Sequence, residues 1–128
     1  MTPDFFWLIA SVALAFVQVL VASGTATAQV GGPTICGNRE DMAPLTGLAR
    51  RAKCAHANMM ENLPLFIALV LVVHLSNRVN SVSLFGEQLF FWARLLHAIV
   101  YVIGIPWVRT LLWVISLIGM LLIFLQLL

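Results

Sequence analysis

Four long apolar segments, separated by shorter polar stretches, dominate the chain. They cover about residues 5–23, 53–75, 84–104 and 107–128. A bilayer core about 30 Å thick requires roughly 20 mostly apolar residues per helix. Each segment is long enough, so we expect an all-α integral membrane protein: a single-domain, four-transmembrane-helix bundle.

The connections differ in length and character. The first, residues 24–52, is the longest and is rich in glycine, proline, threonine and charge, so we expect it to carry function. The last, Gly104-Ile105-Pro106, predicts a tight turn, because proline suits the first turn of a helix. A cleaved signal peptide is the alternative for the first segment, since Ala26-Thr27-Ala28 is similar to a cleavage site. The acidic start at Asp4 argues against it, because signal peptides begin with basic residues.

Composition supports a membrane environment. Hydrophobic residues make up 62% of the 128 residues and charged residues only 9%, whereas soluble domains are about 25% charged. The net charge of +2 and the lack of a long basic run give no indication of nucleic-acid binding. Cys36 and Cys54 have neither disulfide-framework nor zinc-like spacing, so we expect free thiols, no metal site, and membrane lipids as partners.

The distribution of positive charge predicts an orientation. Five basic residues fall at the first and third connections: Arg39, Arg50, Arg51, Lys53 and Arg109. Arg78 stands alone on the other side. Because cytoplasmic loops carry the excess of lysine and arginine, we expect the 24–52 loop in the cytoplasm and both termini outside it, as in a bacterial inner-membrane protein.

Polar side chains also occur at membrane depth. Arg51, Asn58 and Glu61 share one stripe of the second helix, and Arg94, His97 and Tyr101 share one of the third. Charge at this depth costs about 2.5–3.5 kcal/mol per residue, so these groups should face other helices or water.

Depth suggests which of these groups meet. At 1.5 Å per residue, Glu61 lies about 12 Å and Arg94 about 15 Å from the cytoplasmic side. We therefore expect a Glu61–Arg94 ion pair between antiparallel helices. Intramembrane pairs often only hold helices together, so a purely structural role is the competing interpretation. His56 points almost opposite to Asn58 and should belong to a different contact.

Two stretches, in the order expected, resemble the MAPEG family, the membrane-associated proteins in eicosanoid and glutathione metabolism. The first runs from Arg51 to Pro64 (RAKCAHANMMENLP). The second runs from Ala93 to Tyr101 (ARLLHAIVY) and is followed by GIPWVRT at residues 104–110. Gly37 to Asp41 (GNRED) is also similar to bacterial members.

The resemblance implies a homotrimer that holds glutathione between neighbouring subunits near the cytosolic face. Arg109 would steady the glutathione thiolate, assisted by Tyr101 or Thr110. The remaining positions would bind glutathione or support its site: Arg51, Asn58, Glu61, Arg94, His97 and, in the first loop, Arg39. A thiol with a pKa of about 8.5 is mostly protonated at neutral pH, and a nearby cation favours the nucleophilic anion.

Two departures weaken a prediction of tight glutathione binding. Ala57 stands where some eukaryotic members have arginine, and Thr110 where the prostaglandin-forming member has serine. The resemblance implies a glutathione-dependent transferase or peroxidase acting on lipophilic electrophiles. The alternatives are a non-catalytic lipid-binding or scaffold subunit of a larger membrane complex, and haem ligation by His97 or His56.

Overall fold

The computed structural model describes residues 1–40 and 42–128 and is helical, with no strand within those ranges. Its elements are α1 (Pro3–Val30), α2 (Gly32–Cys36), α3 (Gly47–Leu75), α4 (Ser81–Ile103) and α5 (Pro106–Leu125). Asp41, the last residue of the GNRED stretch, lies outside the described ranges.

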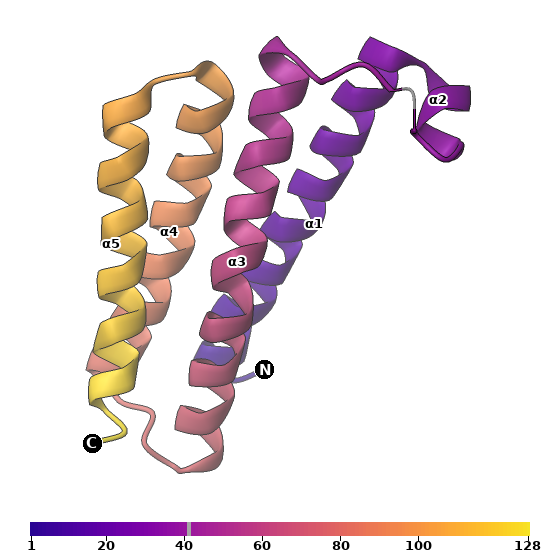
Figure 1. The fold of residues 1–128 in the computed structure, drawn as a ribbon. Coiled ribbons are helices and arrows are strands. Elements are labelled where there is room, and N and C mark those ends of the chain that lie inside the picture. Colours follow the sequence, from indigo (N-terminus) through magenta and orange to yellow (C-terminus); the bar gives the residue numbers. More distant parts are fainter. Residues whose placement is uncertain (41) are drawn as a thin grey trace.

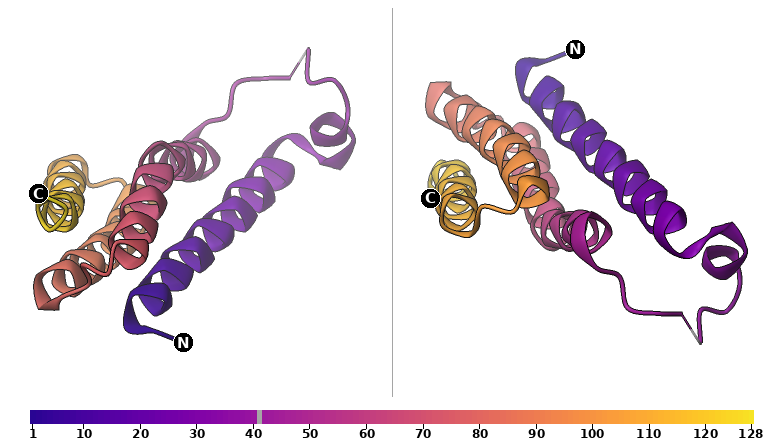
Figure 2. Two further views of the ribbon diagram at one scale, coloured as in Figure 1. Left: turned by 90° about the horizontal axis from the view of Figure 1, so that it is seen from below. Right: turned by 90° about the horizontal axis from the view of Figure 1, so that it is seen from above.

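The four long helices alternate in direction, so both termini lie at the same end of the bundle (Figure 1). Seen end-on, α1 and α5 lie on opposite sides of the α3–α4 pair (Figure 2). By length and composition, α1, α3 and α5 are apolar enough to cross a membrane. With α4 they form the expected four-helix bundle, whose outer faces carry many exposed large apolar side chains, as lipid contact requires.

The first helix is longer than predicted, because it continues from residue 23 to Val30. Gly24 and Thr25 are weak helix formers, and they suggested a break there. However, the Thr25 hydroxyl donates to the carbonyl of Val21 at 2.8 Å, which satisfies it within the helix. The helix ends at Gly31, whose φ of +91° favours glycine.

The third helix begins at Gly47 rather than near residue 53. The Gln29 side chain stabilises its start, because Nε2 donates to the Thr46 carbonyl and Oε1 accepts from the Thr46 amide, both at 2.9 Å. The predicted loop of residues 24–52 therefore shrinks to 31–46 and contains the short helix α2.

The last two helices closely match the prediction. The predicted tight turn at Gly104-Ile105-Pro106 is confirmed, with Gly104 in the left-handed region at φ +98° and Pro106 opening α5. Asn80 and Ser83 form a reciprocal cap at the start of α4, which fixes its first turn.

Aromatic and charged contacts align the helices around a common core. The rings of Phe66 in α3 and Phe90 in α4 stack with centroids 4.0 Å apart. At the end of the bundle that holds both termini, buried Asp4 accepts a 2.6 Å hydrogen bond from Nδ1 of His74, a contact that was not predicted from the sequence. These contacts connect α1 to α3 and α3 to α4, and so set the register of the polar stripes.

Helices α4 and α5 approach closely where Gly86 faces Gly119. A Cβ added at Gly119 would lie 2.7 Å from the Gly86 carbonyl oxygen and 3.0 Å from the Phe90 amide nitrogen. Small residues permit such close backbone approach in membrane bundles. We expect Gly119→Ala to lower the free energy of unfolding by about 1–3 kcal/mol through overpacking.

The matched control is Gly24→Ala, because a Cβ there meets nothing within 4 Å and alanine favours a helix over glycine. Loss of helicity during titration with denaturing detergent measures both variants. Equal or greater stability of Gly119→Ala would show that the two backbones are not in contact.

Candidate functional site

A polar pocket of about 200 Å³ lies between α3, α4 and α5. It is near the end of the bundle where α4 turns into α5. Its lining residues are Asn58 from α3, His97 and Tyr101 from α4, and Arg109, Thr110 and Trp113 from α5. Five of these were candidate site residues in the sequence, and the fold brings them together.

The Arg109 guanidinium lies over the ring of Tyr101, with its central carbon 4.4 Å from the ring centroid. This cation–π contact orients the cation toward the pocket. Tyr101 is itself positioned edge-on by His97, with ring centroids 5.5 Å apart. Arg109 and Thr110 share the first turns of α5, which Pro106 begins. The tight turn therefore places a cation and a hydroxyl beside a phenol.

Asn58, on the inner wall of the pocket, is hydrogen-bonded to Arg94, which lies behind it. Arg94 Nη2 donates to Asn58 Oδ1 at 2.8 Å, and the Arg94 and His97 side chains are both about 1% exposed. Arg94 Nε and Nη1 and His97 Nδ1 have no hydrogen-bond partner among the described residues. Since buried donors are normally paired, the two Arg94 nitrogens can donate further hydrogen bonds to water or to a bound polar molecule.

The predicted Glu61–Arg94 ion pair is wrong. Glu61 is exposed on α3, and within residues 1–40 and 42–128 it makes no ion pair with Arg94. Arg94 instead contacts Asn58, which lies about one turn before Glu61 on the same helix. A neutral amide, rather than a carboxylate, therefore holds the buried guanidinium.

Two further arginines lie away from this pocket. Arg51 Nε donates to the Val102 carbonyl at 2.8 Å, and its side chain packs against Gly104. It therefore connects α3 to the end of α4 instead of lining the pocket. Arg39 lines another polar pocket of about 220 Å³, together with Lys53 and His56.

The two polar pockets occupy different faces of α3. Asn58 lines the first and His56 the second, which confirms that these two side chains belong to different contacts. The second pocket is bounded by the end of α1, by α2 and by the start of α3. It brings Arg39 from the first loop close to Lys53, which the sequence alone could not do.

Two informative residues were missed at the level of sequence. Trp113 lines the pocket and was not among the predicted site residues; its spacing of four residues from Arg109 places both on one helical face. Glu87 is completely buried in α4, and neither carboxylate oxygen has a hydrogen-bond partner among the residues described. The sequence signal for Glu87 is an ionisable residue within an apolar helix, which by itself indicates a functional or buried polar site.

The pocket combines a cation, a phenol, an aliphatic hydroxyl, an amide and an imidazole around a small volume. This set suits a small anion that also accepts hydrogen bonds, because guanidinium binds carboxylates and thiolates as an ion-pairing donor. In the described part of the chain, no three histidine, cysteine or acidic side chains lie close enough together to hold a metal ion.

Comparison with known proteins agrees with the two motifs. The model of the MAPEG family matches residues 6–128, nearly the whole chain. Searches of curated proteins and of solved structures give no match.

Proposed function

The chain belongs to the MAPEG family, and on this premise we propose that it is a membrane-bound glutathione-dependent transferase acting on lipophilic electrophiles. The observation that carries the proposal is Arg109, held over Tyr101 in a polar pocket between membrane-spanning helices. A thiol bound there would meet a cation that an aromatic ring holds in place. Peroxidase action on a lipid hydroperoxide is the related reaction that the same thiolate would support.

In the proposed reaction, Arg109 stabilises the ionised thiol of glutathione. The thiolate sulfur forms a bond to the electrophilic carbon, and the leaving group departs with the electron pair of its own bond. The thiol proton passes to solvent, so the products are a thioether, a solvated proton and the leaving group as its anion. The hydroxyls of Tyr101 and Thr110 can donate hydrogen bonds to the sulfur, which further favours the anion.

The remaining polar residues of the pocket would bind the peptide part of glutathione. Asn58 and His97 line the pocket, and Arg94 lies directly behind Asn58. The Asn58 amide and the His97 imidazole can hydrogen-bond the polar groups of the peptide, either directly or through water.

We further propose a homotrimer in which the two polar pockets of neighbouring subunits meet. In a three-fold ring, each interface joins two different surfaces of the subunit, one from each neighbour. Arg39, Lys53 and His56 of one subunit could then face the Arg109 pocket of the next. Arg39 lies apart from Arg109 within one chain. In this arrangement, Arg39 of one subunit would still contact glutathione bound beside Arg109 of the next.

The proposed location is a bacterial inner membrane, with both termini outside the cytoplasm. The two termini lie at one end of the bundle (Figure 1), and Arg78 is the basic residue near that end. Of the other six basic residues, Arg94 lies within α4 and five lie toward the opposite end, near the Arg109 pocket. The positive-inside rule places that end in the cytoplasm, where glutathione would be available.

Turnover tests the proposal. The full chain in phosphatidylcholine vesicles should accelerate the reaction of glutathione with an apolar aryl halide well above the rate in empty vesicles. Acceleration should require glutathione and should disappear with its S-methyl derivative, which has no ionisable thiol. If neither an aryl halide nor a lipid hydroperoxide is turned over and glutathione does not bind at millimolar concentration, the scaffold alternative is correct.

A further inference from the structure

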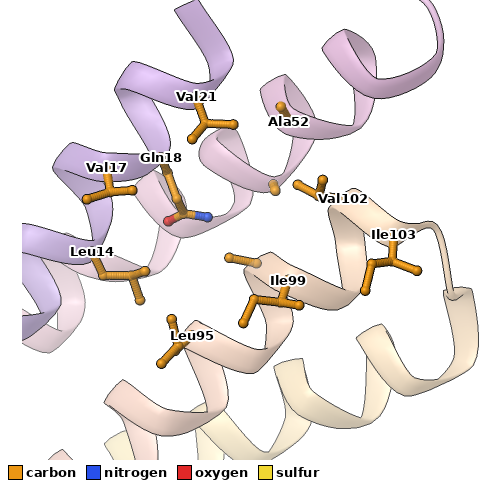
Figure 3. A pocket seen from close by; sticks show the side chains of 11 residues that line it. Leu14, Val17, Gln18, Val21, Ala52, Leu95, Ile99, Val102 and Ile103 are labelled. Carbon is orange, nitrogen blue, oxygen red and sulfur yellow. The ribbon is translucent and has the colours of Figure 1, made fainter. Parts of the chain in front are cut away.

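A larger cavity, of about 330 Å³, lies on the other side of the α3–α4 pair, against α1 (Figure 3). The space exists because α3 and α4 present short side chains there, namely Ala52, Ala55 and Ala98. Its volume falls within the roughly 300–1,000 Å³ typical of small-molecule sites. No residue of this cavity also lines the Arg109 pocket.

One polar side chain enters this apolar cavity. Gln18 of α1 is only 7% exposed, and its amide points into the cavity toward α4 (Figure 3). Its Oε1 has no hydrogen-bond partner among the residues described. A buried amide without a partner costs free energy, and glutamine sits deep in a helix that is otherwise suited to span a bilayer. The amide therefore indicates a ligand that donates a hydrogen bond.

The cavity opens toward lipid rather than toward water. Val17 and Ile99 line it, and about half of each side chain is exposed, 53% and 49% respectively. Val17 lies in the middle of α1, and Ile99 lies one turn before the end of α4. A molecule entering here would come from the acyl-chain region, and the wall supplies no charge to compensate a charged headgroup.

We propose that the cavity binds a single-chain neutral lipid with a free hydroxyl, of the long-chain alcohol class. The hydroxyl donates to Gln18 Oε1. The alkyl chain of the lipid lies against the alanines and leaves the cavity between Val17 and Ile99. This site is separate from the proposed thiol chemistry and does not depend on it. The lipid fills the gap between α1 and α4 and donates to the Gln18 Oε1 atom, which has no partner among residues 1–40 and 42–128.

Photolabelling of the full chain in phosphatidylcholine vesicles tests this site. The probes are a long-chain alcohol carrying a diazirine and the matching diazirine alkane without the hydroxyl. The alcohol should label cavity residues of α1 and α4 about fivefold more than the alkane, as one hydrogen bond provides. Gln18→Met, which keeps the length of the side chain, should reduce alcohol labelling to the alkane level without loss of helicity.

Two alanine replacements complete the test. Ala98→Leu fills the cavity and should lower labelling by both probes, whereas Ala13→Leu adds the same bulk to an exposed position on α1 and should change neither. Equal labelling by alcohol and alkane in the unmodified protein would overturn the proposal. So would alcohol labelling that survives Gln18→Met or Ala98→Leu, or a cavity that neither probe reaches because a second copy covers it.

Discussion

Replacement of Arg109 by glutamine is expected to abolish thiolate formation and to reduce turnover of an aryl halide by roughly 100-fold or more, the effect of removing one transition-state donor. The guanidinium is the only cation lining the pocket in the part of the chain that the structure describes. Without it, bound glutathione should stay protonated at neutral pH. The measurement is the far-ultraviolet absorbance of thiolate as glutathione is titrated, alongside the rate of conjugation.

The matched control is Arg78→Gln, which removes an arginine at the opposite end of the bundle, where its Nη1 donates to the Leu127 carbonyl at 3.3 Å. This variant should bind and ionise glutathione as the unmodified protein does. Arg109→Lys should recover part of the thiolate signal, because it restores the charge but not the planar fork. An unchanged thiolate signal in Arg109→Gln would remove Arg109 from the mechanism.

The second large effect concerns folding. Asn58→Leu removes the oxygen that accepts from Arg94 at 2.8 Å and leaves a guanidinium about 1% exposed without that partner. Leaving a buried donor without its acceptor costs about 1–3 kcal/mol, and more when the donor is charged. The double variant Asn58→Leu/Arg94→Met should recover most of this loss, because both polar groups are then gone.

Detergent-induced loss of helicity measures the free energies of unfolding for this series. Glu61→Gln is the informative comparison, since Glu61 is exposed and does not contact Arg94; we expect a change below about 0.5 kcal/mol. A large loss of unfolding free energy in Glu61→Gln, together with a small loss in Asn58→Leu, would show that Glu61 and not Asn58 holds Arg94.

Much of the fold was predictable because lipid imposes simple requirements. Apolar length alone located four helices, and Gly104 with Pro106 marked the α4–α5 turn. The extent of α1 and α3 was not predictable from hydropathy. Polar residues such as Thr25 and Gln29 find hydrogen-bond partners within or between helices, so polarity at residues 24–30 did not end the helix.

The candidate site was predictable in part, because helical periodicity places Arg94, His97 and Tyr101 on one face and the turn returns Arg109 to that face. Periodicity does not determine how two facing helices are rotated. Depth along the chain resolves a partner only to about one turn, 5.4 Å, and Asn58 and Glu61 are only three residues, or about 4.5 Å, apart along α3. Charge complementarity favoured Glu61, and the actual rotation of α3 brought Asn58 to Arg94.

A structure of the protein in lipid with saturating glutathione tests the central claim most directly. We predict density for the peptide in the pocket of Asn58, His97, Tyr101 and Arg109, with its sulfur closest to the Arg109 guanidinium. Density bound elsewhere, or a pocket that stays free of the peptide at millimolar concentration, would contradict it.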